Sequence, residues 1–493
     1  MAARPNLVLF MPDELRADAL AGYGNPVTRT PHFDRLAAEG VRFDQCHVQF
    51  PVCGASRCSM LTGWPAHVRG HRSLYYFLRP DEPNLFRDLR RAGYDVYWFG
   101  KNDALAAASF ADSVTEWRDR SPPLSAATLA EFASGGQTPG STTMLFSASG
   151  DRRAGGDYAN LQAAIRFLER RERDRPFCIF LALSQPHPPY RAPDGFHDLY
   201  DPDELPPLVP PGLSGKPPFH AALRGACNLS AVDERTLRRV RAVYLGQACY
   251  SDWLLGELID ALERTGHAAT TALVATSDHG DYAGDYGLIE KWPAGQEDCL
   301  TRVPLVARLP GGAAGHVVAE MVELFDLMPT FLELAGGVAS HTHFARTLVR
   351  QLNGAPGDTG RAAFTEGGYN PYEPQAFEPL LMGGVYEPKT RLQNEQPATV
   401  ARCASIRTQT HRLVVRPGGG SELYDCAADP GLTENLIEDP SSAGVRDALR
   451  ERLLGWYVMT SGVPAPDKDA RGLPPFLRTP SFGAAAAVAG YLD

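Results

Sequence analysis

The chain has 493 residues, and its composition of 44% hydrophobic and 22% charged residues excludes a disordered protein. The length suggests roughly two to four domains, or one large α/β domain with a smaller one. Its 48 lysines and arginines against 58 aspartates and glutamates give a net charge of −10. This charge argues against nucleic acid and anionic membranes as partners, because both need basic patches. A small anionic ligand stays compatible with it wherever a few cations converge.

The sequence contains no pattern typical of membrane insertion or secretion. Its longest apolar run, residues 177–183, is far shorter than the roughly 18–20 residues of a transmembrane helix. Residues 7–10 are apolar but no cleavage site follows them, so we expect no signal peptide and a cytoplasmic protein. The nine cysteines have no paired spacing, so most are expected to be free thiols. A homo-oligomer is compatible with the composition, and the oligomeric state is left open.

Apolar runs that alternate with amphipathic stretches predict an α/β protein. Residues 6–11 are continuously apolar, as in a strand buried on both faces of a parallel sheet. Residues 30–40 then predict a helix with a capping threonine, a first-turn proline and a terminal glycine. The later predicted elements are helices over 84–91, 161–170 and 233–264, and strands over 94–99, 176–183 and 271–276. This alternation is typical of a sandwich around a largely parallel sheet.

Polar side chains follow four of the predicted strands. They are Asp13, Lys101, His187 and the pair Asp278-His279. In open parallel sheets, ligands bind beyond the carboxyl ends of the strands. These five side chains are therefore expected to lie around one site.

The pattern changes after about residue 400. Residues 401–407 and 411–415 predict a hairpin, 422–424 a third strand, and 444–457 a helix. We expect a main domain over 1–365 and a small α+β C-terminal subdomain over 366–493. Long loops are predicted over 121–156, 186–220 and 366–400, and the last of these, rich in glycine, proline and aromatic residues, is expected to contact a ligand.

The segment Pro51–Gly63 contains a candidate nucleophile. Residues 56–62 predict a short helix closed by a glycine, with Cys53 at its N-terminus, where free N–H groups favour an anion. Arg57 lies four residues on, on the same helical face. These features together predict an activated thiol beside a cation. A half-buried thiol without chemical function is the alternative, and it is the more common state of a lone cysteine.

The same segment resembles the signature of the type I sulfatases, members of the alkaline phosphatase superfamily. That signature is Cys-x-Pro/Ala-x-Arg followed by Leu-Thr-Gly, and Ala55 is here its rarer variant. The resemblance implies that a formylglycine-generating enzyme oxidises Cys53 to Cα-formylglycine, whose hydrated aldehyde is the nucleophile. Six further segments resemble elements of the family in the same order. They are residues 6–14, 93–101, 184–187, 276–280, Lys291 with 302–305, and 422–436.

The resemblance implies a metal site. Asp13 and Glu14 stand where the family has two aspartates, and Glu14 either binds the cation or only lines the site. Asp278 and His279 stand where it has Asp-Asn or Asp-His. Because the donors are mostly oxygen, Ca²⁺ is the expected divalent cation, and the histidine keeps Mn²⁺ and Mg²⁺ as alternatives.

The resemblance also implies roles for the remaining polar residues. Arg57 holds the nucleophile, Lys101 and Lys291 bind sulfate oxygens, and His187 protonates or hydrogen-bonds the leaving group. The family's histidine after the Gly-Lys motif falls on Asp103, so that contact is missing or reassigned. Taken singly, each residue also has an ordinary interpretation, such as a turn aspartate or a solvated surface lysine. Four histidines are left unassigned. They are His67 and His71, which are near Cys53 in sequence, and His341 and His343.

The expected protein is therefore a sulfuric ester hydrolase that cleaves a small anionic sulfate monoester. Its expected fold is an alkaline-phosphatase-like sandwich with a large mostly parallel sheet and a small α+β C-terminal subdomain. Two alternatives stay open. One is a phosphonate monoester or phosphodiester hydrolase of the same superfamily, since sulfate and phosphate esters share shape. The other is a non-catalytic binding protein with unmodified Cys53.

Overall fold

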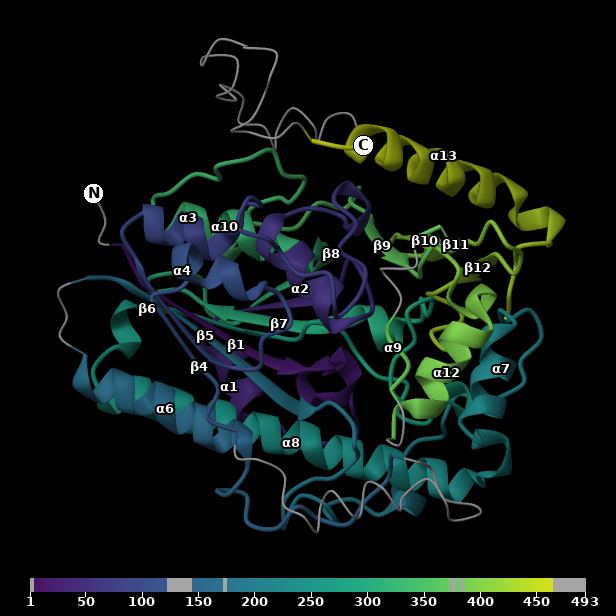
Figure 1. The fold of residues 1–493 in the computed structure, drawn as a ribbon, viewed down its shortest axis with the longest axis horizontal. Coiled ribbons are helices and arrows are strands. Elements are labelled where there is room, and N and C mark those ends of the chain that lie inside the picture. The colour runs from purple at the N-terminus through teal and green to yellow at the C-terminus, as the bar shows by residue number, and fades with distance from the viewer. Residues whose placement is uncertain are drawn as a thin grey trace.

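The computed structural model describes residues 4–121, 144–171, 175–370, 372–373, 378–381 and 385–463. Parts of the predicted loops 121–156 and 366–400, and the end of the C-terminal subdomain, lie outside these residues. The described part is a sandwich of helices around a large sheet, with a small sheet and one long helix at its side (Figure 1).

The large sheet has the strand order β4-β3-β5-β1-β6-β7-β2-β8. Within it, only β7 is antiparallel to its neighbours among the described residues. The strands are β1 Asn6–Asp13, β2 Val41–His47, β3 Asp95–Gly100, β4 Glu116–Arg118, β5 Phe177–Pro186, β6 Thr271–Thr276, β7 Arg302–Arg308 and β8 His316–Glu323. The mostly parallel sheet is confirmed. β2, β4, β7 and β8 are not among the predicted strands. Charged residues interrupt the apolar pattern of β2 and β8, β4 has only three residues, and β7 contains a proline.

Alternate side chains of β1 enter two different cores, which explains its continuous apolar run. Val8 and Phe10 pack against the layer that contains α1, α6 and α8. Leu7, Leu9 and Met11 pack against the layer that contains α2, α3 and α10. Both faces of the sheet are therefore covered, as parallel sheets require.

Each predicted helix has a counterpart in the structure, whereas α4, α7 and α9 to α12 were not predicted. α6 begins five residues before the predicted helix, and α8 is the 31-residue helix that Asp233 caps through the Thr236 N–H. The helices are α1 Pro31–Ala38, α2 Cys53–Thr62, α3 Leu85–Arg91, α4 Phe110–Ser113, α6 Gly156–Arg170, α7 Phe219–Ala226, α8 Glu234–Arg264, α9 Asp298–Thr301, α10 Leu327–Leu334, α11 Val349–Leu352, α12 Glu387–Glu395 and α13 Ala443–Thr460. None of these described helices combines the length and the apolar character needed to cross a bilayer.

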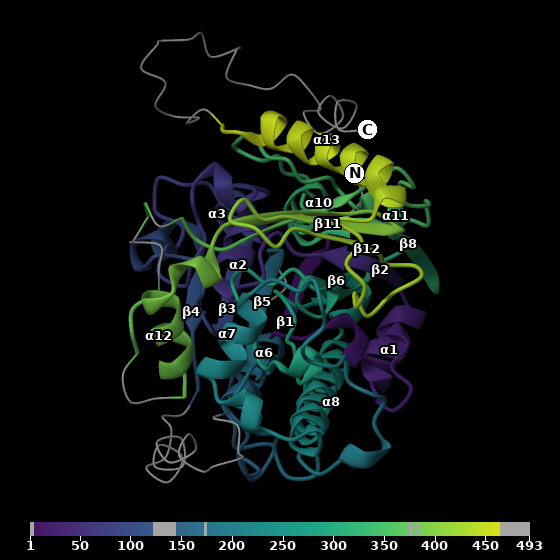
Figure 2. The same ribbon diagram turned by 90° about the vertical axis from the view of Figure 1, so that its right-hand side faces the viewer.

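The C-terminal part forms a four-stranded antiparallel sheet under α13 (Figure 2). Its strands are β9 Ala363–Gly367, β10 Cys403–Arg407, β11 His411–Val415 and β12 Glu422–Asp425. Trp456 of α13 stacks on Phe364, with ring centroids 4.8 Å apart. The boundary predicted between residues 365 and 366 falls inside β9, whose pairing with β10 places the whole strand in the small sheet.

The parallel direction of four strands positions the site. β3, β5, β1 and β6 are neighbours and run the same way. Their carboxyl ends therefore meet at one edge of the sheet, where Asp13, Lys101, His187 and the Asp278-His279 pair follow them. The predicted convergence of these side chains rests on this geometry.

Candidate active site

Helix α2 carries Cys53 into the interior at its first turn. The extended backbone of Val52 precedes the helix, and Gly63 ends it with a left-handed φ of 67°. All ten helical residues are buried. A Cβ on Gly54 would lie 2.8 Å from the Ser73 carbonyl oxygen, so only glycine allows this close approach. The helix begins three residues earlier than predicted and includes Cys53 itself.

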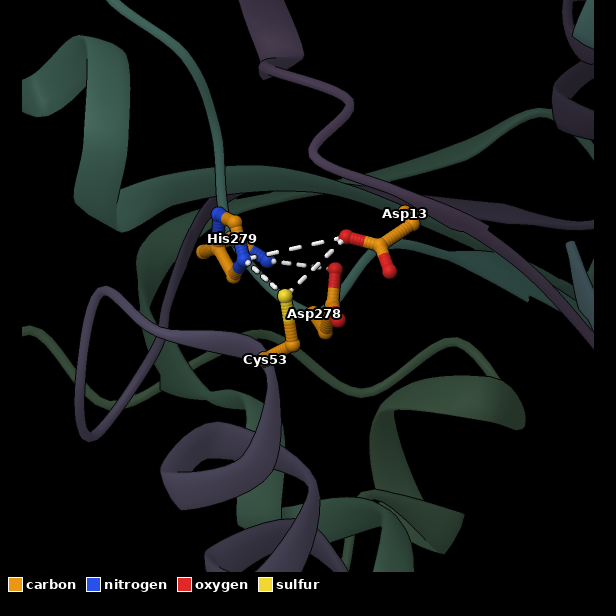
Figure 3. Close-up of side chains that lie close together, drawn as sticks. All are labelled: Asp13, Cys53, Asp278 and His279. Atoms are coloured by element: carbon orange, nitrogen blue, oxygen red, sulfur yellow. Dashed lines mark hydrogen bonds and ion pairs between the residues drawn. The ribbon is translucent and has the colours of Figure 1, made fainter. Parts of the chain in front are cut away.

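The Cys53 thiol lies near an aspartate and a histidine (Figure 3), and a lysine lies slightly farther away. Its Sγ is 3.4 Å from Asp13 Oδ1, 3.1 Å from His279 Nε2 and 4.0 Å from Lys101 Nζ. His279 Nδ1 is 2.9 Å from the Gly280 carbonyl oxygen, so this nitrogen carries the proton and Nε2 presents a lone pair to Cys53.

Arg57 joins the two aspartates that come from distant strands. Its Nε donates to Asp278 Oδ2 at 2.7 Å and its Nη2 to Asp13 Oδ2 at 3.0 Å. All three side chains are fully buried, and among the described residues Arg57 Nη1 has no hydrogen-bond partner. A buried guanidinium between two carboxylates keeps their charges compensated and their positions fixed.

Burial and charge determine the protonation of this cluster. Burial opposes ionisation of Asp13, but Lys101 and Arg57 outweigh it and hold its pKa well below the usual value. Burial lowers the pKa of His279, consistent with a neutral ring. Burial and the Asp13 carboxylate raise the pKa of the Cys53 thiol well above its usual value. The prediction of an activated thiolate is therefore wrong for the unmodified cysteine, because the helix start is dry and faces a carboxylate.

Lys101 is shared between two carboxylates. Its Nζ lies 2.6 Å from Asp13 Oδ2 and 2.8 Å from Asp103 Oδ2. The Asn102 side chain orders this loop by accepting hydrogen bonds from the N–H groups of Ala104 and Leu105. Asp103 thus occupies the position of the family's histidine and contacts the lysine that the resemblance assigns to the sulfate.

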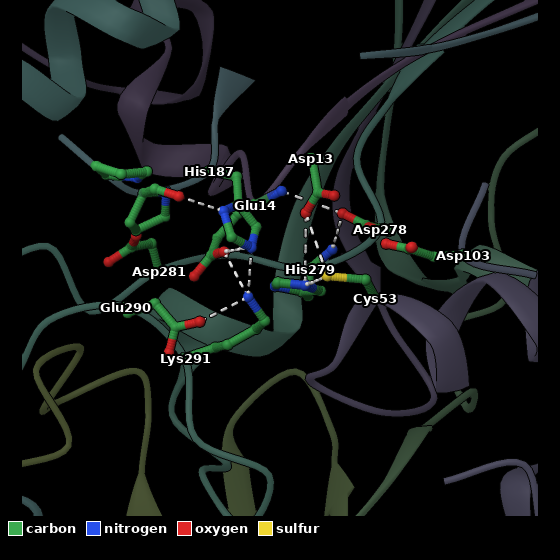
Figure 4. A network of polar contacts seen from close by, with 12 residues as sticks. Asp13, Glu14, Cys53, Asp103, His187, Asp278, His279, Asp281, Glu290 and Lys291 are labelled. Atoms are coloured by element: carbon green, nitrogen blue, oxygen red, sulfur yellow. Dashed lines mark hydrogen bonds and ion pairs between the residues drawn. The ribbon is translucent and has the colours of Figure 1, made fainter. Parts of the chain in front are cut away.

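A second group of polar side chains surrounds Lys291 (Figure 4). Its Nζ is 2.8 Å from Glu14 Oε2, 2.9 Å from His187 Nε2 and 2.8 Å from Glu290 Oε1. Glu14 and Glu290 have left-handed φ values of 69° and 61°, which is unusual outside glycine and typical of functional sites. Glu14 Oε1 is buried and has no partner among the described residues.

The proton of this second group resides on the lysine. Burial, followed by the charges of Lys291 and Lys101, lowers the pKa of His187 well below its usual value. Burial disfavours the charged form of Lys291, but the Cys53 and Glu14 groups outweigh it and raise its pKa. His187 Nδ1 contacts the Pro188 carbonyl oxygen at 2.5 Å, so Nε2 accepts from Lys291. The two residues act as a hydrogen-bonded pair.

The segment before and within α12 contacts residues next to His187 and Lys291. These contacts were not predicted from the sequence. The Tyr386 hydroxyl donates to the Pro188 carbonyl oxygen at 2.9 Å, the same oxygen that His187 Nδ1 contacts. Lys389 forms a buried ion pair with Glu290, which in turn contacts Lys291. The sequence signal for the contact of Glu290 with Lys291 is that the two residues are adjacent in the chain.

The structure brings the predicted metal ligands into two adjoining groups. Asp13, Asp278 and His279 gather with Cys53, and Asp13 is shared with a group that contains Glu14 and His187. Within each group, the donor atoms lie within 4.8 Å of one another. Mainly oxygen donors with one imidazole nitrogen, together with the unpartnered Glu14 oxygen, fit a hard divalent cation.

The four unassigned histidines have structural partners away from this cluster. His67 Nδ1 contacts Glu366, and His71 Nε2 contacts Glu82, both at 3.0 Å. His341 Nε2 contacts the Thr62 carbonyl oxygen at 2.6 Å, and its ring packs edge-on against that of His343.

Comparison with known proteins gives concordant results. An arylsulfatase of Clostridium perfringens is 28% identical over 67% of this chain and 75% of its own length. A multifunctional alkaline phosphatase superfamily protein of Trinickia caryophylli is 26% identical over 92% of this chain and 95% of its own length. A solved phosphonate monoester hydrolase of Agrobacterium radiobacter matches with a TM-score of 0.73 at 24% identity, covering 93% of this chain and 96% of that one.

The likeness to the solved structure concerns the fold alone, and it confirms the predicted alkaline-phosphatase-like sandwich. The model of the family described as Sulfatase matches residues 5–338, from β1 to just beyond α10. This match covers more than half of the chain and includes all nine predicted site residues. The chain therefore belongs to the sulfatase family.

Proposed function

We propose that this protein hydrolyses sulfate monoesters, with a formylglycine at position 53 as nucleophile and a divalent cation bound beside it. The observation that carries the proposal is the position of Cys53 Sγ, 3.4 Å from Asp13 Oδ1 and 3.1 Å from His279 Nε2. A nucleophile at this position touches the predicted cation ligands and lies 4.0 Å from the predicted sulfate-binding Lys101.

The surroundings of position 53 fit a hydrated aldehyde better than a thiol. Two acceptors, Asp13 Oδ1 and His279 Nε2, face the Sγ atom. A thiol has one hydrogen and satisfies one acceptor, whereas a hydrated aldehyde has two hydroxyl groups and satisfies both. When formylglycine is present, it supplies this hydrated aldehyde as the nucleophile. The partner that the proposal requires is a formylglycine-generating enzyme.

Asp13, Asp278 and His279 would hold the cation, with Glu14 as the fourth candidate ligand. Arg57 and Lys101 keep Asp13 ionised, and Arg57 holds both aspartates in place, so the carboxylates are arranged for a cation in advance. Ca²⁺ is the cation that we propose for this donor set. When bound, it takes up charge on the sulfate oxygens and lowers the pKa of the nucleophile.

The remaining side chains act on the ester itself. Lys101 and Lys291 present positive charge to the sulfate oxygens. His187 lies on the Lys291 side, with its Nε2 2.9 Å from Lys291 Nζ, where it protonates or hydrogen-bonds the leaving oxygen. The ring centroid of Tyr386 is 6.3 Å from that of His187, so Tyr386 lies on the leaving-group side and contributes to the choice of substrate.

A phosphonate monoester or phosphodiester is the second candidate substrate. The fold matches that of a phosphonate monoester hydrolase, and the Trinickia caryophylli relative is described as multifunctional. Both ester types carry one negative charge and have a tetrahedral centre, so both fit the same groups.

The test compares 4-nitrophenyl sulfate with 4-nitrophenyl phenylphosphonate, which share one leaving group. The protein is produced with a formylglycine-generating enzyme and loaded with Ca²⁺. We expect turnover of the sulfate, with the higher kcat/KM for that substrate. A higher kcat/KM for the phosphonate would select the second candidate. Turnover of neither ester, or equal turnover by the Cys53→Ala variant, would contradict both.

Cation binding is tested by replacing the ligand aspartates. Asp13→Asn and Asp278→Asn should each weaken the bound cation by at least the 10–100-fold typical of lost outer partners, with the fold retained. Glu14→Gln should have a smaller effect. Elemental analysis after dialysis measures the cation, and circular dichroism measures the fold. Asp281→Asn is the matched control, because Asp281 is buried nearby without being a predicted ligand. Full occupancy in both aspartate variants would refute the assignment.

A further inference from the structure

Asp103 places a negative charge next to the proposed sulfate site. Its Oδ2 is 2.8 Å from Lys101 Nζ, which is itself 4.0 Å from Cys53 Sγ, so the carboxylate lies within about 7 Å of the nucleophile position, where unit charges still interact strongly. Its side chain is 14% exposed, and Figure 4 shows it on the same side of Asp13 as Cys53. Asp103 is not among the candidate cation ligands.

The charges around the nucleophile are nearly balanced. Three cations face it, namely Arg57, Lys101 and Lys291, and each is paired with two carboxylates. Glu290 is neutralised by its further ion pair with Lys389. The other four carboxylates paired with these cations are those of Asp13, Glu14, Asp278 and Asp103, and the Asp281 carboxylate is buried beside Glu14.

Burial raises the pKa of Glu14 well above its usual value, so the effect of Asp103 is counted as a difference: its carboxylate makes the site one unit more negative, whatever charge the other groups have. His187 and His279 contribute nothing when each carries one ring proton, as their contacts with backbone carbonyls indicate. Without Asp103 the same site would be one unit more positive, which favours a dianionic ligand over a monoanionic one.

We propose that Asp103 determines the charge class of the substrate, selecting monoanionic esters over dianionic ones. This inference rests on the proposed function. Sulfate monoesters, phosphonate monoesters and phosphodiesters carry one negative charge, whereas a phosphate monoester carries two above about pH 7. The sulfate ion that hydrolysis releases is also a dianion. The Asp103 carboxylate therefore rejects phosphate monoesters and favours departure of the product.

The test replaces Asp103 by asparagine, which keeps an acceptor for Lys101 and removes only the charge. Two substrates share a leaving group and a phosphorus centre at pH 8, namely the dianion 4-nitrophenyl phosphate and the monoanion 4-nitrophenyl phenylphosphonate. We expect the ratio of their kcat/KM values to rise roughly 10- to 100-fold in favour of the dianion. Asp103→Ser provides a second neutral variant, and exposed Asp112→Asn is the matched charge control.

A binding measurement separates this inference from turnover. In the Ca²⁺-loaded Cys53→Ala protein, calorimetry with inorganic sulfate and with methanesulfonate compares a dianion with a monoanion. Adding Asp103→Asn should tighten sulfate by roughly 10- to 100-fold more than methanesulfonate. Asp112→Asn should leave both affinities unchanged.

The outcomes are distinguishable. An unchanged kcat/KM ratio in an active Asp103→Asn enzyme, or equal tightening of both ions, would overturn the role of Asp103 and leave the proposed function intact. If the wild-type enzyme hydrolyses none of the esters, the proposed function fails, and the calorimetric arm still decides whether Asp103 sets the charge preference.

Discussion

Replacing Cys53 by alanine should reduce sulfatase activity by about 10⁴-fold or more, the scale seen when an enzyme loses its nucleophile. The unmodified thiol is itself unsuited to the task, since burial and the Asp13 carboxylate raise its pKa. Activity should therefore follow the fraction of chains that carry an aldehyde at position 53. Labelling of the tryptic peptide of residues 43–57 with a hydrazide probe measures this fraction, and initial rates on 4-nitrophenyl sulfate measure activity.

The control for this prediction is Cys58→Ala, on the same helix. Cys58 is buried, and its Sγ lies 3.5 Å from the Ala104 carbonyl oxygen rather than in the cluster. This variant should keep both the aldehyde and most of the activity. An intact cysteine in peptide from fully active enzyme would show that the nucleophile has been misidentified. Inactivity of protein made without the modifying enzyme does not test this prediction, because its Cys53 is expected to be unmodified.

His187→Ala should leave activated aryl sulfates nearly unaffected and slow alkyl sulfates by about 10²–10⁴-fold. A nitrophenolate departs without a proton, whereas an alkoxide requires one. Lys291→Ala should slow both substrates by about 10²–10³-fold, because the charge on the sulfate oxygens is present with every leaving group. The rate ratio for two esters of different leaving-group pKa, measured in wild type and both variants, checks this division.

Because His187 Nε2 contacts Lys291 Nζ, the opposite assignment, in which Lys291 is the proton donor, can also be tested. In the free protein the lysine carries the proton, so a selective loss on alkyl sulfates confined to Lys291→Ala would identify Lys291 as the donor. Equal losses on both substrates for His187→Ala would reduce that histidine to a binding residue. Glu395→Gln, on the exposed side of α12, serves as the control that should change neither rate.

The sequence predicted those parts of the site that depend on local pattern and on chain direction. Each of the predicted polar residues comes at or after the end of a strand, namely Asp13, Lys101, His187 and the Asp278-His279 pair. These strands are parallel, so their carboxyl ends lie at one edge of the sheet. Their types and order were enough to indicate the family. Their division into a Cys53 group and a Lys291 group was not predictable, because it depends on side-chain directions that no spacing encodes.

Other features depend on contacts between distant segments and were missed for that reason. Lys389 meets Glu290 across 99 positions of sequence, and Tyr386 meets Pro188 across 198. Neither pair has a periodic signature. β9 was assigned no strand, since its last two residues fall at the start of the predicted loop 366–400, and its pairing with β10 defines it.

The complete burial of α2 limits when the proposed modification of Cys53 can take place relative to folding. Cys53 has no exposed surface, and all ten residues of its helix are buried. A modifying enzyme needs the peptide around its target in an accessible form, which the folded chain does not offer. Under the proposed function, oxidation of Cys53 is therefore expected while the chain is still unfolded, during or soon after synthesis. A molecule that folds before this oxidation would keep its cysteine and be inactive, so the yield of active enzyme would depend on the relative rates of folding and modification.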